Sequence, residues 1–241
     1  MAREIGTNEK NIVEFIKMLA EGRFLIPSFQ REVVWEPPDI IKLWDSIYRF
    51  YPIGSLLYWE TDILLNIHRE LGGFTLPAHE NPSRPSGHRQ YILDGQQRAT
   101  SLLIPLLGGT GKVKGHKGFD YTLYFDAVSA MFFFGNEYKS RRRETNPAFL
   151  VRLGLVYQGQ PAHSKTISSE PGFTGAIDKN LRRLDRVFSD YRLSLISIKG
   201  FDIPAVREIF ERINQEGKEL SSTDIMVART FQNYDCKVEE D

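Results

Sequence analysis

The residues best suited to chemistry lie in the stretch YILDGQQRATSLL, where an apolar run ends and a second, helix-like segment begins. Asp94 ends the apolar run, Gly95 follows it, and Gln96, Gln97 and Arg98 open the next segment. Glycine permits a tight turn, and the unpaired amides at the start of a helix attract anions. Arg98 adds a guanidinium fork that can bind two phosphate oxygens. This pattern predicts an anion-binding turn.

The other polar side chains of the turn have two readings. Asp94 could hold a magnesium ion through water or orient Arg98, while Gln96 and Gln97 could position a water or hydrogen-bond a base. The alternative is an ordinary helix start, with Asp94 near the cap position and the glutamine and arginine side chains in solvent. The local pattern leaves both readings open.

Other nucleotide and metal motifs are missing from the sequence. The segment LLGGTGKVKG lacks a phosphate-binding loop pattern, because Leu106 stands where the first glycine belongs and Val113 follows Lys112. The histidines are scattered without ligand spacing, and one cysteine, Cys236, cannot build a zinc site. A zinc centre is therefore not expected.

Strands and helices must position the turn, and they alternate irregularly, which predicts an α+β fold. Pro105 is expected to end the helix after the turn, and Asn8 to cap the first helix. Apolar periodicity predicts helices over 8–22, 37–54, 96–103, 146–159, 176–191 and 202–217. It predicts strands over 55–60, 91–94, 121–127, 130–135 and 192–199. Polar, turn-rich composition predicts surface loops over 66–90 and 160–175.

Four motifs in order resemble a known family: IPSFQREVVW, YPIGSLLYW, YILDGQQRATSL and IFERINQEGKELSSTDI. They are similar to the N-terminal domain of GmrSD-type modification-dependent restriction enzymes, over residues 12–231. The resemblance implies a ParB/sulfiredoxin-like mixed sheet with flanking helices and a helical extension. It places a nucleotide-binding domain at 1–231, with a helical insertion around 136–190, and leaves an acidic tail at 232–241.

The resemblance also implies roles for the turn. In this family the Asp-Gly-Gln-Gln-Arg segment resembles the phosphate-binding turn of ParB-type nucleotide switches and is associated with binding and hydrolysis of a nucleoside triphosphate. Matching the positions assigns Asp94, Gln97 and Arg98 to catalysis. Gly95 and Gln96, together with Arg98, are assigned to nucleotide binding.

More distant residues are assigned to the same pocket. Gln30 and Arg31 match the Gln-Arg pair of the family, and Gly54 with Ser55 forms a helix-to-strand turn expected beside the nucleotide. The FERIN segment is similar to the ParB helix that carries a Glu-Asn pair near the triphosphate. The resemblance thus implies that Asn214 contacts nucleotide and that Glu211, with Asp94, holds Mg²⁺.

Family members typically continue into a His-Asn-His (HNH) nuclease domain, and this sequence ends at Asp241 with no such motif. We therefore expect an NTP-binding, and on balance NTP-hydrolysing, regulatory domain of a phage-defence system. It would act with an HNH-type nuclease domain or partner protein on DNA, modified DNA included, and the sequence leaves both a monomer and a homodimer open. One alternative is a metal-dependent nuclease using Asp126, Glu137 and Lys139. Another is a nonhydrolysing nucleotide or DNA sensor.

Composition bears on which partners and which compartment we expect. The chain has 31 basic and 31 acidic residues, so no global field draws it to nucleic acid. Two arginine-rich stretches, SRRRET and LRRLDR, could meet DNA phosphates, although charged runs are more often solvated faces. The sequence lacks a signal-peptide pattern and an 18-residue apolar run, so we expect a cytoplasmic protein without a membrane partner.

Overall fold

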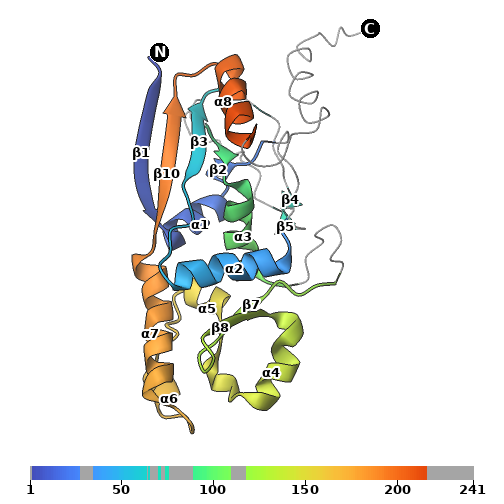
Figure 1. The fold of residues 1–241 in the computed structure, drawn as a ribbon, viewed down its shortest axis with the longest axis vertical. Coiled ribbons are helices and arrows are strands. Elements are labelled where there is room, and N and C mark those ends of the chain that lie inside the picture. Colours follow the sequence, from blue (N-terminus) through green and yellow to red (C-terminus); the bar gives the residue numbers. More distant parts are fainter. Residues whose placement is uncertain are drawn as a thin grey trace.

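A computed structural model describes residues 2–27, 35–63, 65, 70–71, 74–75, 89–109 and 118–215 (Figure 1). Its main sheet has five strands in the order β1-β10-β3-β6-β2, and a second sheet has the order β8-β7-β9. The strands are β1 (Glu4–Asn11), β2 (Phe24–Leu25), β3 (Leu56–Thr61), β4 (Glu70–Leu71), β5 (Phe74–Thr75), β6 (Arg89–Asp94), β7 (Leu123–Asp126), β8 (Met131–Phe134), β9 (Leu150–Arg152) and β10 (Arg192–Lys199). This mixed architecture confirms the α+β class.

Eight α-helices surround the two sheets in the described part of the chain. They are α1 (Ile12–Ala20), α2 (Pro37–Tyr48), α3 (Gln96–Leu107), α4 (Tyr138–Glu144), α5 (Leu153–Tyr157), α6 (Lys165–Ser168), α7 (Gly175–Asp190) and α8 (Ile203–Gln215). Within the described ranges, every helix is too short or too polar to span a bilayer.

The main sheet is mixed and buries side chains on both faces. β10 runs parallel to β3, β3 antiparallel to β6, and β6 parallel to the short β2. Because successive strand residues point to opposite faces, Leu56 and Tyr58 join the core formed with α1, α2 and α3, whereas Leu57 and Trp59 join the apolar cluster under α8. The sheet therefore separates α3 from α8.

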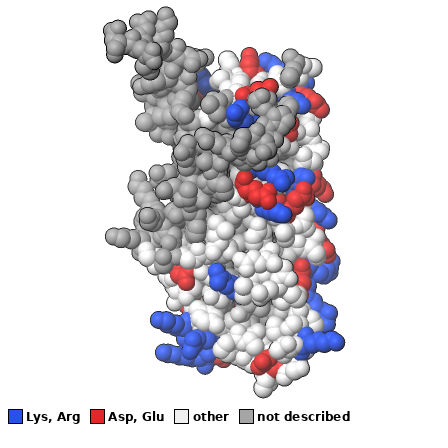
Figure 2. All heavy atoms as spheres, turned by 180° about the vertical axis from the view of Figure 1, so that it is seen from behind, with Lys and Arg blue, Asp and Glu red and all other residues white. Residues whose placement is uncertain are grey.

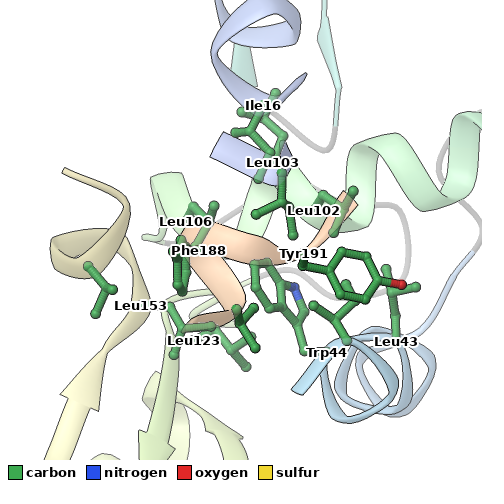
Figure 3. Close-up of a cluster of buried hydrophobic side chains, with 14 of the residues drawn as sticks. Ile16, Leu43, Trp44, Leu102, Leu103, Leu106, Leu123, Leu153, Phe188 and Tyr191 are labelled. Atoms are coloured by element: carbon green, nitrogen blue, oxygen red, sulfur yellow. The ribbon is translucent and has the colours of Figure 1, made fainter. Parts of the chain in front are cut away.

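The larger core links the main sheet to the second one. Trp44 of α2 is fully buried at its centre and its ring stacks on Phe188 of α7 at 6.0 Å. Figure 3 shows side chains from α1, α2, α3, β7, α5 and α7 meeting around it. The apolar stripes of α2 and α7 are buried in this core: Ile40, Leu43, Trp44, Ile47 and Tyr48, and Ile177, Leu181, Leu184 and Phe188.

The start of the chain differs from the prediction. Residues 4–11 form β1, an edge strand with polar, mostly exposed side chains that carry no period-two signal. The first helix begins at Ile12, and Asn11 is its cap, with its side chain accepting from the Val13 amide at 2.8 Å. Asn8 instead lies in β1 and donates to the Tyr58 hydroxyl at 3.0 Å. The prediction of Asn8 as the cap was wrong.

Pro105 does not end α3, which continues to Leu107. A proline inside a helix leaves the carbonyl four residues earlier without its usual donor. Here that carbonyl belongs to Ser101, and the indole Nε1 of buried Trp44 donates to it at 3.1 Å. Packing against α2 thus satisfies the group that proline leaves unpaired, and the helix ends only at Gly108.

Three further stretches differ from the prediction. Residues 146–159, expected as one helix, form a short 3₁₀ helix (Pro147–Phe149), strand β9 and α5, because β9 pairs with β7 in the second sheet. The expected loop over 160–175 contains the four-residue α6. The expected loop over 66–90 contains β4 paired with β5, and its last two residues begin β6.

Candidate functional site

The predicted anion-binding turn lies between the end of β6 and the start of α3. Asp94 is the last residue of β6, and Gly95 is the N-terminal cap residue of α3 with a φ of +87°. A Cβ atom at this position would also come within 2.8 Å of the Leu56 Cδ2 atom in β3. Both the backbone conformation and the contact with β3 therefore require glycine here.

Arg98 joins three separate segments at this turn. Its Nη2 group donates to Asp94 Oδ2 at 2.9 Å, and its Nη1 group donates to the carbonyl oxygen of Ile53 at 3.0 Å. The Arg98 side chain is 19% exposed and that of Asp94 37%. One guanidinium thus ties the end of β6 and the first turn of α3 to the loop before β3.

Asp94 stands one residue before the cap position of α3. The cap residue is Gly95, which has no side chain to bond the helix amides. The Asp94 carboxylate accepts from Arg98 Nη2 at 2.9 Å. Asp94 therefore orients the arginine, and its role in holding magnesium stays a prediction.

Gly54 shapes the other side of the guanidinium. Its φ is +82°, and a Cβ atom built on it would lie 2.6 Å from Arg98 Nη1. Any side chain at this position would push the guanidinium out of place. The structure thus brings Gly54 next to Arg98, with partly buried Ser55 as the next residue. The Ile53 carbonyl was missed by the sequence analysis, since a backbone acceptor leaves no mark on residue type.

The two glutamines have different surroundings. Gln96 is only 6% exposed, so its side chain belongs to the interior more than to an open ligand site. Gln97 Oε1 accepts from the backbone amide of Trp35 at 3.3 Å, which fastens the start of α2 to α3. Gln30 and Arg31, predicted to complete the pocket, lie outside the described residues.

The residues predicted on α8 are on the other side of the main sheet. α8 packs on that face through Val206, Ile209 and Phe210. Glu211 Oε1 accepts from Arg207 Nε, one turn earlier in the same helix, at 2.9 Å. Asn214 lies in the last turn of α8, and its side chain lies outside the described part. Its role and that of Glu211 stay predictions.

The turn retains groups that could bind a phosphate. A guanidinium has five N–H donors, and Arg98 uses two of them in the bonds to Asp94 and Ile53. The N-terminus of α3 lies at the same turn and adds the positive end of the helix dipole. Positive charge and donors are thus assembled beside a carboxylate that is partly exposed.

Two of the three residues of the nuclease alternative, Asp126 and Glu137, have partners within the fold, whereas Lys139 is exposed. Asp126 is 3% exposed and accepts from the Val128 amide and the Ser129 hydroxyl, at 2.9 and 2.8 Å, so it stabilises the β7–β8 turn. Arg141 lies between Asp126 and Glu137 and pairs with both carboxylates. Across the described ranges, no group of three or more His, Cys, Asp or Glu side chains is placed to hold a metal ion.

Comparisons with known proteins support the family that the motifs resemble. Residues 11–231 match the family described as GmrSD restriction endonuclease, N-terminal domain. The chain is also similar to an uncharacterized protein, MJ0686, of Methanocaldococcus jannaschii, with 26% identity over 263 residues. That alignment covers 95% of this chain and 42% of the relative, which is much longer. Because the family match spans nearly the whole sequence, the chain belongs to the family of GmrSD restriction endonuclease N-terminal domains.

Proposed function

We propose that this chain is the nucleotide-binding regulatory domain of a restriction system directed at foreign DNA. In this proposal the phosphates of a nucleoside triphosphate bind at the β6–α3 turn of a ParB/sulfiredoxin-like fold. Membership in the GmrSD family supports the restriction role. The geometry of the turn supports the choice of ligand.

The observation that carries the proposal is the placement of Arg98. Its guanidinium is held by the Asp94 carboxylate and the Ile53 carbonyl at the N-terminus of α3. A fixed arginine loses little conformational entropy when an anion arrives, and charge-assisted bonds to phosphate are strong. In this proposal the guanidinium donates to the phosphates, and the positive end of the α3 dipole adds to the attraction.

Hydrolysis needs a metal ion or a positioned water in addition to nucleotide binding. We propose that Asp94 is the residue that binds the metal ion. Magnesium is usually bound by one or two protein carboxylates together with phosphate oxygens and water, so a cluster of three acids is not required. Asp94, 37% exposed, has a carboxylate of the right type. Glu211, which the resemblance implies as a second ligand, lies across the main sheet from the turn and is paired with Arg207, so it is not part of this proposed site. Bound at Asp94, the ion would neutralise charge on the phosphates. Gln97 is the proposed residue for positioning the attacking water.

The cleaving activity is proposed to reside elsewhere. The chain spans 42% of the length of the relative it matches, which leaves room for further domains in proteins of this kind. We propose an HNH-type nuclease domain or partner protein that is controlled by the nucleotide state of this domain, with DNA as the final target. The surroundings of Asp126 and Glu137 favour a structural role over cleavage by this domain.

A nucleotide panel tests the proposal on the purified chain. Binding of each nucleoside triphosphate is measured by calorimetry with magnesium, and phosphate release is measured in the same samples. We expect binding and slow hydrolysis of at least one triphosphate. Binding without release would support the nonhydrolysing sensor, and absence of binding across the panel would contradict the proposal. The chain alone should leave duplex DNA uncut.

A further inference from the structure

Two helices carry the arginine-rich stretches of the sequence, and the structure gives them different surroundings. On α7, Arg182 donates to Asp178 at 2.8 Å and Arg186 to Asp190 at 3.1 Å. The hydrogen bond from Arg182 is the main reason that the pKa of Asp178 is lowered. Arg182 and Arg186 are therefore already paired with carboxylates of the same helix.

The remaining α7 arginine is also engaged. Arg183 Nε donates to the Tyr48 carbonyl oxygen at 2.7 Å, and its guanidinium lies 5.2 Å from the centre of the Tyr48 ring. Arg183 thus anchors α7 to the end of α2. The LRRLDR stretch is explained by folding alone.

α4 is held to the second sheet by one side of the helix. The Tyr138 ring packs on the Tyr124 ring of β7 at 4.8 Å, and the Arg141 guanidinium lies 4.8 Å from the centre of the Phe133 ring in β8. Arg141 also pairs with Asp126 and Glu137. Positions 138 and 141 are three residues apart and so lie on the same side of the helix.

The opposite side of α4 carries a basic face, which we define as Lys139, Arg142 and Arg143. All three are exposed, and none forms an ion pair within the described part of the chain. Spacings of three and four residues place them together on the helix surface. Figure 2 shows Lys and Arg side chains gathered at the lower left, at the end of the molecule where α4 lies. Exposed Glu144 offsets one of the three charges.

We propose that the basic face of α4 binds the phosphate backbone of duplex DNA. From Lys139 to Arg143 the helix rises about 6 Å, which is close to the axial rise of about 7 Å over two phosphate steps of one strand. A protein partner would need an apolar centre to its interface. The exposed residues of α4 are all polar or charged: Lys139, Ser140, Arg142, Arg143 and Glu144.

The choice of DNA among nucleic acids rests on the proposed restriction function. Contacts to phosphates position a protein and add affinity without reading sequence. The α4 face therefore gives general, salt-sensitive attachment to DNA. Recognition of a base or a modification must come from other residues.

The test compares two triple variants of the chain. One removes the α4 face (Lys139→Ala, Arg142→Ala and Arg143→Ala), and the matched control removes three positive charges from α7 (Lys179→Ala, Arg182→Ala and Arg186→Ala). Affinity for a fluorescent duplex of about 20 base pairs, long enough to span the face several times, is measured by anisotropy at several salt concentrations. Each lost phosphate contact should reduce the slope of log affinity against log salt by about 0.9, so the α4 variant should lose about 2.7.

We expect at least tenfold weaker DNA binding for the α4 variant at about 0.1 M salt and a smaller change for the α7 control. Equal losses in both variants, no loss in either, or no binding by the wild-type chain would overturn the inference. Tighter binding of a duplex RNA of the same length would overturn DNA as the occupant. Thermal unfolding checks that both variants fold.

Nucleotide affinity separates this inference from the proposed function. Both variants should bind nucleoside triphosphate like the wild type, because α4 is remote in sequence and structure from the β6–α3 turn (Figure 1). Absent nucleotide binding with intact α4-dependent DNA binding would contradict only the proposed function. The reverse result would contradict only the DNA surface.

Discussion

The β6–α3 turn and α8 each contain an arginine paired with a carboxylate, but the two pairs connect different parts of the fold. In each, an arginine and a carboxylate stand four residues apart with their closest atoms at 2.9 Å: Arg98 with Asp94, and Arg207 with Glu211. The α8 pair lies within one helix. In the turn, the carboxylate ends a strand, the arginine lies in a helix, and the guanidinium also reaches the Ile53 carbonyl.

The difference shows that spacing and distance alone do not measure the importance of an ion pair. Exposed pairs within a helix contribute about 0.3–0.5 kcal/mol. Removing Arg98 would leave Asp94 and the Ile53 carbonyl without their donor, and unpaired, partly buried acceptors cost more. The connection across segments therefore makes the turn a candidate site. The following variants test this contrast.

Arg98→Ala should have the largest effect. We expect nucleotide affinity to fall more than tenfold, because a charge-assisted contact to phosphate is lost, and the free energy of unfolding to fall by about 1–3 kcal/mol. Calorimetry measures the affinity and urea unfolding the stability. Wild-type nucleotide affinity in this variant would contradict the phosphate site.

Arg98→Lys separates charge from geometry. Lysine keeps the positive charge but cannot donate to Asp94 and Ile53 as a planar fork. We expect affinity between those of the wild type and Arg98→Ala. An affinity equal to that of Arg98→Ala would mean that the fork, and not the charge, is what the ligand needs.

Gly54→Ala should come next, with Gly159→Ala as its matched control. Both glycines have positive φ, +82° and +96°, so both substitutions should cost about 1–2 kcal/mol of stability. A Cβ at position 54 would lie 2.6 Å from Arg98 Nη1, whereas position 159 has no atom within 4 Å. Only Gly54→Ala should also weaken nucleotide binding, by severalfold. Equal affinities in the two variants would argue against the role of Arg98 in binding.

Local sequence patterns predict some features around these residues and miss others. Residue types and spacing predicted the strand, the glycine turn and the arginine, since each leaves a local signature. The partner of Arg98 on the loop before β3 is a backbone carbonyl, which any residue at position 53 would supply. The continuation of α3 through Pro105 depends on Trp44, 61 positions earlier, and β1 is a polar edge strand. Such features arise from tertiary contacts and solvent exposure, which local patterns do not encode.

Asp94→Asn should separate binding from hydrolysis. Removing a negative charge beside the phosphates should leave affinity unchanged or slightly higher, while the proposed magnesium ligand is lost. We expect most turnover to disappear and stability to fall by no more than about 1 kcal/mol, because the pair with Arg98 is partly exposed. Phosphate release and binding are measured on one preparation. Unchanged hydrolysis would restrict Asp94 to orienting Arg98.

Glu211→Gln should have the smallest effect on stability. Its carboxylate accepts from Arg207 in the same helix, so the loss should be about 0.3–0.5 kcal/mol. The informative measurement is the magnesium concentration required for half-maximal hydrolysis. Glutamine keeps the size but removes the charge that binds a hard cation, so the loss of a magnesium ligand would raise this requirement. Because α8 lies across the main sheet from the turn, we expect the requirement and the nucleotide affinity to stay unchanged. Arg207→Gln breaks the same pair and leaves the carboxylate in place. We expect the two variants to behave alike, because the carboxylate stabilises α8 and takes no part in hydrolysis. A higher magnesium requirement in Glu211→Gln alone would instead identify Glu211 as a ligand.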